Sequence, residues 1–209
     1  MILLAMLASM VSPPQPKNVS DWMSSKDIDE NMLPASYKAS WLRVIVDQQG
    51  RPFDCKVRTS SGVEYIDLFS CSLLVHNGRF KPATDQNGKA VHGVFERAIS
   101  WDLADHRVLA STAEADLRLE VSRLPLGVEN HTQIFAYLVT DAAGNVEDCE
   151  ASEAAPKNQR SSAATPLLKL ACEAATSSWT PALGRSYGFE NVRAVQSILV
   201  QFDLNRSGD

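Results

Sequence analysis

The segment DQQGRPFDC at residues 47–55 recurs 94 positions later as DAAGNVEDC at residues 141–149. Further along, each copy carries a second cysteine, an aromatic-x-Pro-Ala segment and an aromatic-Asp-Leu ending: Cys71, FKPA at 80–83 and WDL at 101–103, then Cys172, WTPA at 179–182 and FDL at 202–204. A period this long is too large for a solenoid unit. The order of these landmarks therefore predicts two tandem copies of one small domain.

The pattern around the first copy predicts a strand, a second strand, a helix and a third strand. Residues 41–47 alternate with period two and lead through the Asp-x-x-Gly turn into a returning strand at 53–59. Apolar residues at helical spacing then mark a helix over 65–75, and a strand follows over 91–103 after the proline of FKPA.

The second copy repeats this order, with an extra leading strand at 117–124 and a longer polar loop at 152–164. Its predicted elements are strands at 134–140 and 145–151, a helix at 165–177 and a strand at 192–204. The sequence therefore predicts an α+β protein of two tandem small domains, each an antiparallel β-β-α-β sheet with a helix packed on one face. The domains span 32–103 and 117–204, each with its own core, and 104–116 links them.

Composition narrows the function classes. The chain has 209 residues, a formal net charge of -5 and 44% hydrophobic residues, so a packed core is expected. Its basic residues do not cluster into a stripe, so a nucleic-acid partner is not expected. No run of about 20 apolar residues is present, so no membrane-spanning helix is expected.

The N-terminal residues 1–31 read as a signal-like and linker segment. MILLAMLASM at 1–10 is a short apolar run followed by small residues, as in a signal peptide, but it lacks the usual basic start. The alternatives are a true signal peptide and a buried N-terminal element. Export is the interpretation that agrees with the cysteines, and PPQP at 13–16 suggests a spacer.

The four cysteines fall two per copy, at equivalent strand and helix positions. This placement predicts a Cys55–Cys71 and a Cys149–Cys172 disulfide, each joining the second strand to the helix. Small domains in oxidising compartments often depend on such bonds. Buried free thiols are an alternative; metal or redox chemistry is a weaker one, because the spacing is unlike that of metal sites.

No catalytic, metal or cofactor site is expected. The four histidines, His76, His92, His106 and His131, are scattered along the chain without a telling partner. Ser60 and Ser61 precede a glycine but lack the context of a nucleophile turn, so they are interpreted as a turn and helix cap. Asp54 and Asp148 each precede a cysteine, and lie in different copies.

A further set of residues carries a family resemblance: DCKVRTSSG at 54–62, Ile66 and Asp67, RFKPA at 79–83 and GKAV at 88–91. Over about residues 32–103, this pattern resembles the C-terminal domain of the energy transducer TonB. The second copy has no SSG turn and has WTPA instead of RFKPA, so it resembles the family only as a divergent copy. The resemblance implies a periplasmic module that binds a short segment of an outer-membrane receptor and transmits force in envelope transport.

The expected function is therefore non-enzymatic binding of an extended peptide by strand addition. The strand that follows RFKPA is the expected binding edge, with Val91, His92, Val94, Glu96, Ala98 and Ser100 as its site residues. The expected localisation is the periplasm, with membrane association if the chain begins downstream of an anchor. The alternatives are an envelope-assembly protein that forms homodimers through its sheet edges and, more remotely, an enzyme with a site that no motif marks.

Overall fold

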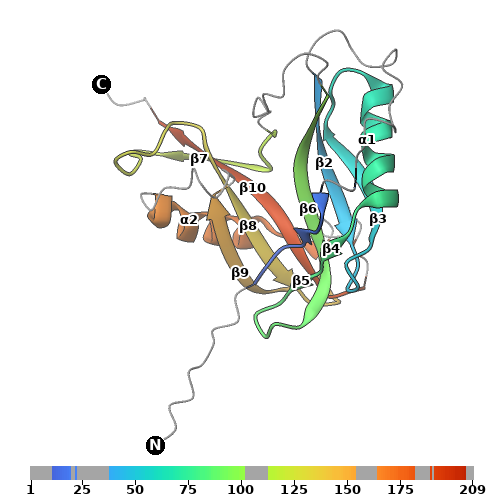
Figure 1. Ribbon diagram of the computed structural model, residues 1–209. Coiled ribbons are helices and arrows are strands. Elements are labelled where there is room, and N and C mark those ends of the chain that lie inside the picture. Colours follow the sequence, from blue (N-terminus) through green and yellow to red (C-terminus); the bar gives the residue numbers. More distant parts are fainter. Residues whose placement is uncertain are drawn as a thin grey trace, which may run out of the picture.

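The computed structural model describes residues 11–19, 22, 38–101, 113–153, 164–181, 189 and 191–205. Within this part the protein is a mixed α+β structure with one large sheet and two helices, as Figure 1 shows, so the α+β class is confirmed. Residues 1–10, 104–112 and 154–163, which carry parts of the predicted signal segment, linker and loop, lie outside the described residues.

The main elements begin and end within a few residues of the predicted ranges. The first half contains β2 (Lys38–Val46), β3 (Pro52–Thr59), α1 (Glu64–Asn77), β4 (Phe80–Lys81), β5 (Ala83–Thr84) and β6 (Ala90–Trp101). The second half contains β7 (Leu117–Val121), β8 (Thr132–Thr140), β9 (Val146–Glu153), α2 (Thr165–Ser178) and β10 (Ala194–Leu204). The short strand β1 (Gln15–Pro16) precedes both halves and was not predicted.

The two halves share one sheet. Its strand order is β3-β2-β6-β10-β8-β9, with β5 also pairing with β6 and β7 with β10. The junction is a short parallel contact in which His92 pairs with Ala194 and Gly93 with Val195. β10 is buried along almost its whole length, as expected of a strand with neighbours on both sides and cover on both faces.

The helices cover opposite faces of this sheet. In Figure 1, α1 lies against β2 and β3 on one outer side, and α2 lies against β8 and β9 on the other. The pairing register agrees with this arrangement of the helices. Val195 and its partner Gly93 lie on one face of the sheet. Ile198 and Val200 lie on the other face and pack in the core with α2.

Each helix covers a core of its own. Around α1 the buried side chains are Trp22, Leu42, Val44, Val46, Ile66, Leu74, Phe80, Ile99 and Trp101. Around α2 they include Ile134, Leu138, Leu167, Ala171, Trp179, Ile198 and Phe202. Smaller clusters join the halves; one of them combines Ala83 and Val91 with Val139 and Val195.

The Asp-x-x-Gly turns that marked the repeat have the same hydrogen bonds in both halves. Asp47 Oδ1 accepts from the N–H groups of Gln49 and Arg51. Asp141 Oδ1 accepts in the same way from Ala143 and Asn145. The aspartate thus satisfies donors that the tight turn leaves unpaired, which explains why it recurs.

Gly50 is the position in the first turn where a side chain should be least tolerated. Its φ is +79°, and a Cβ there would lie 2.0 Å from the carbonyl oxygen of Phe80. The Phe80 N–H also donates to the Gly50 carbonyl, at 2.9 Å. This close approach holds the FKPA segment against the turn.

We expect Gly50→Ala to destabilise the protein much more than Gly62→Ala. Gly62 has a similar φ of +81°, but a Cβ there meets nothing within 4 Å. Gly62→Ala should therefore cost only the conformational strain, about 1–2 kcal/mol. Gly50→Ala should cost at least about 2 kcal/mol more, because the FKPA segment must also move. Chemical denaturation of both variants measures this, and equal losses would contradict it.

Candidate functional site

The predicted peptide-binding strand lies inside the sheet. β6 pairs with β2 from Gly93 to Trp101, with β5 at Ala90 and Val91, and with β10 at His92 and Gly93. The expectation that β6 is an outer edge strand is therefore corrected. The sequence did not reveal the second neighbour, because only two rungs join β6 to β10.

The six predicted site residues have different surroundings. Val91 and Val94 are buried, at 1% and 2% exposure. The ring of His92 lies between those of Phe53 and Phe189. Ala98 and Ser100 pair with β2. Val91, His92 and Val94 are thus covered by other parts of the protein, whereas Ala98 and Ser100 are half-buried.

Glu96 is part of a buried ion cluster between the halves. Its side chain is 1% exposed and lies 2.6 Å from Arg43 Nη2 and 2.8 Å from Arg58 Nη1. Both arginines also approach Asp116, at 3.7 Å and 2.8 Å. We call these four side chains the ion cluster. Glu96 was expected to face a free edge, and this expectation is corrected.

The ion cluster also reaches the backbone of β10. Asp116 Oδ2 accepts from the N–H of Leu199 at 2.7 Å, and the Asp116 N–H donates to the Leu199 carbonyl at 2.8 Å. A second bridge between the halves joins Arg193 to Asp85, at 3.1 Å, and to Glu147. Charged contacts thus hold the halves together on both sides of the β6–β10 junction.

The two outer strands, β3 and β9, each have an N–H that is already satisfied. Asp54 Oδ1 accepts from the N–H of Cys55, and Asp148 Oδ1 from the N–H of Cys149, both at 2.8 Å. A donor that bonds to its own neighbour is not offered to another strand. Asp54 and Asp148 thus occupy equivalent positions in the two halves and each bond to the N–H of the cysteine that follows.

Residues 11–19 and Trp22, here called the N-terminal strap, lie along the FKPA segment as an added antiparallel strand. Gln15 pairs with Lys81 and Pro16 with Phe80. Ser12 and Thr84 exchange two backbone hydrogen bonds of 3.0 and 2.9 Å, and Lys17 N–H donates to the Arg79 carbonyl at 2.8 Å. Part of the segment expected to be a linker thus belongs to the fold.

Three side chains anchor the N-terminal strap. Val11 is 6% exposed and packs in the cluster that joins the halves. Pro14 lies over Gly93, where a Cβ would come within 2.8 Å of the proline ring. Trp22 is 2% exposed and its ring centroid is 4.9 Å from that of Phe80.

The N-terminal strap was not predicted from the sequence. A glycine inside a strand was the available signal, because it often marks the close approach of another segment. Gly93 interrupts the apolar pattern of β6 in this way. A tryptophan at position 22, in an otherwise polar stretch, was the second signal.

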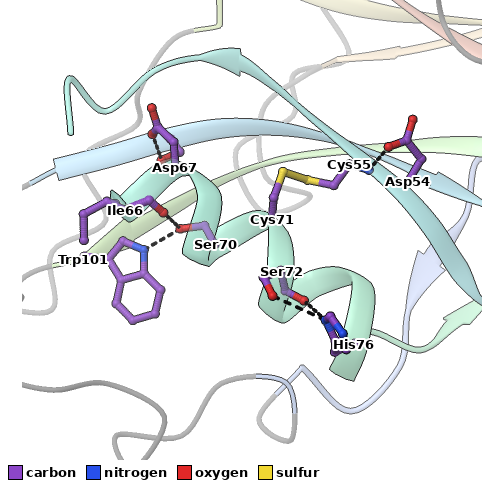
Figure 2. Close-up of a disulfide and its surroundings, with 10 residues drawn as sticks. Asp54, Cys55, Ile66, Asp67, Ser70, Cys71, Ser72, His76 and Trp101 are labelled. Atoms are coloured by element: carbon purple, nitrogen blue, oxygen red, sulfur yellow. Dashed lines mark hydrogen bonds between the residues drawn. A yellow bond between two sulfur atoms is a disulfide. The ribbon is translucent and has the colours of Figure 1, made fainter. Parts of the chain in front are cut away.

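Both predicted disulfides are confirmed. Cys55 bonds to Cys71 and Cys149 to Cys172, with Cα–Cα distances of 5.5 and 5.8 Å. Figure 2 shows the first bond, which connects β3 to α1. Ser70, the residue before Cys71, accepts from Trp101 Nε1 at 2.7 Å and donates to the Ile66 carbonyl at 2.6 Å, so β6 is also fastened to α1.

Asp67 has a structural role beside the SSG turn. Its carboxylate accepts from the hydroxyls of Ser40 and Ser60, both at 2.5 Å, and from the N–H of Ser61 at 2.9 Å. Burial acts to raise the pKa of Asp67, but these hydrogen bonds outweigh it and the pKa is lowered. The ionised form is therefore favoured by folding, and its stabilisation is lost as the pH falls through the lowered pKa.

Among the described residues, no group of three or more His, Cys, Asp or Glu side chains could hold a metal ion. His76 bonds to the Ser72 carbonyl and His131 to Asp203, while His106 lies outside the described residues. A cavity beside the Gly144 turn has a volume of about 30 Å³, whereas ligand pockets measure roughly 300–1,000 Å³. Neither described helix is long and apolar enough to cross a membrane.

Comparison of the chain with models of known protein families, with curated proteins and with solved structures finds no match.

Proposed function

We propose that this protein is a non-enzymatic binding protein of the cell envelope that takes up an extended peptide by strand addition. The observation that carries the proposal is the N-terminal strap itself. This extended segment pairs through backbone hydrogen bonds with residues 79–84, here called the FKPA edge. Such pairing depends mainly on main-chain groups, which is how strand-addition sites bind their ligands.

The location and ancestry of the protein are part of this proposal. Two disulfides are typical of proteins that work in an oxidising compartment, such as the periplasm. The halves 32–103 and 117–204 are proposed to be diverged copies of one β-β-α-β domain, since each has its own core, disulfide and Asp-x-x-Gly turn. The resemblance of the first copy to the TonB C-terminal domain makes a segment of an outer-membrane receptor the proposed ligand, and envelope transport the proposed process.

The proposal is tested by titrating the oxidised full chain with short segments of the periplasmic side of outer-membrane receptors. A scan of N-methylated backbone positions along a bound peptide identifies the binding mode. Strand addition predicts that methylation at every second residue weakens binding by roughly two- to tenfold, because alternate N–H groups face the sheet edge. Methylation at the positions between should have little effect.

Two results would contradict the proposal. One is the absence of binding by any receptor segment. The other is a methylation scan without a period of two, which would indicate recognition through side chains alone. Sedimentation over a range of protein concentrations tests the alternative, since an envelope-assembly protein should form a tight dimer without peptide.

A further inference from the structure

We infer that the N-terminal strap is an intramolecular ligand that closes the peptide groove, and that the external ligand is an extended, proline-containing peptide with a large aromatic side chain after the proline. This inference rests on the proposed strand addition and names its site, its ligand chemistry and its regulation. The groove consists of the FKPA edge, the notch at Gly93 and the aromatic pocket of Phe80 and Phe95.

The FKPA edge is an apolar surface that needs cover. Phe80, Ala83 and Val91 are at most 1% exposed, and Val11 and Trp22 are among the side chains that cover them. Without the N-terminal strap, the N–H of Thr84 and the carbonyls of Thr84 and Arg79 would lose the backbone partners they have here. An edge with unpaired backbone groups and apolar side chains is a template for another extended segment.

The groove selects a proline by its shape. Gly93 has no side chain, and a Cβ at this position would lie 2.8 Å from the ring of Pro14 and 2.5 Å from Ala83 Cβ. The register that pairs Gln15 with Lys81 also places Pro14 opposite Pro82. Neither residue has an N–H, so this rung leaves no donor without a partner.

The aromatic pocket selects a flat, large side chain. The centroid of the Trp22 ring lies 4.9 Å from that of Phe80, with the rings tilted, and 6.4 Å from that of Phe95, with the rings edge to face. Asn77 Nδ2 donates to the Trp22 carbonyl at 3.1 Å, which fixes the backbone at the mouth of the pocket.

The N-terminal strap fills this groove imperfectly, which makes it exchangeable. Trp22 Nε1 is buried without a hydrogen-bond partner. Residues 13, 14 and 16 are prolines and donate no backbone hydrogen bond. A buried unpaired donor and a sparse ladder both weaken binding, so a ligand that makes these bonds can compete with the N-terminal strap.

The test uses a fluorescent peptide with the sequence of residues 11–22 and the oxidised full chain. A tethered segment competes at a high effective concentration, so the wild type should bind the free peptide weakly. Trp22→Ala removes an anchor of the N-terminal strap and should raise the affinity for the peptide at least tenfold. Ser12→Pro removes one ladder donor outside the core and should raise it by a smaller factor.

Val19→Ala is the matched control, because Val19 belongs to the N-terminal strap but is 37% exposed. It should bind the peptide as weakly as the wild type. A peptide with alanine in place of its tryptophan should bind none of the variants. Circular dichroism establishes which variants keep the wild-type fold, and if Trp22→Ala does not, Ser12→Pro decides the result.

Equal affinity of the wild type and the folded variants for the peptide would overturn the inference, as would the absence of binding to those variants. A wild-type dimer that exchanges N-terminal straps would also overturn it, because the occupant would then be a second copy. The two proposals fail separately. Receptor segments that bind with a period of two, but equally well to wild type and Trp22→Ala, refute only the closure by the N-terminal strap.

Discussion

Replacing Glu96 by alanine should lower the free energy of unfolding by about 3–5 kcal/mol, the usual loss when one partner of a buried ion pair is removed. The Glu96 side chain is 1% exposed, and those of Arg43 and Arg58 are 8% and 10% exposed. Without Glu96, Asp116 is the one carboxylate of the ion cluster that remains beside the two guanidinium groups. Glu96→Gln keeps the shape but not the charge, and should lose less.

Urea or guanidinium unfolding, followed by tryptophan fluorescence, measures this loss. Glu173→Ala is the matched control, because Glu173 forms an exposed pair with Lys169 at 3.6 Å on α2. Its removal should change the free energy of unfolding by less than about 0.5 kcal/mol. If Glu96→Ala and Glu173→Ala were equally stable, the ion cluster would not be what holds the halves together.

Removing the disulfides should have a comparable effect, with roughly 3 kcal/mol lost for each bond. The bonded cysteines are separated by 16 and 23 residues, so each closes a short loop and the second should contribute slightly more. Each bond fastens an outer strand, β3 or β9, to the helix above it. The pairs Cys55→Ser/Cys71→Ser and Cys149→Ser/Cys172→Ser separate the two contributions.

The measurement is the unfolding midpoint with and without reductant. Reductant should lower the unfolding midpoint of the wild type strongly. Each double variant keeps one disulfide, so reductant should lower its midpoint only by the contribution of that bond. A variant without any cysteine should not respond to reductant. An unchanged wild-type midpoint after full reduction, verified by thiol titration, would show that the bonds contribute little to stability.

Features encoded over short distances could be predicted from the sequence. Alternating and helical periodicities located the strands and helices, because these patterns express local geometry. The repeated Asp-x-x-Gly turns determined the hairpins through bonds within five residues, as at Asp47 and Asp141. The disulfide pairing followed from the equivalent positions of Cys55 and Cys149, and of Cys71 and Cys172.

Contacts between segments that are distant in sequence are seen only in the folded protein. The β6–β10 junction has two rungs, the ion cluster combines Arg43 with Asp116, and the N-terminal strap crosses Gly93. No periodic sequence pattern marks these contacts, because each joins residues whose separation in sequence is arbitrary. The two repeated sets of elements and the disulfide pairing could thus be predicted without the tertiary structure. Burial of both faces of β10 and of the charges around Glu96 then determined how the sets join, and this moved the candidate site from β6 to the FKPA edge.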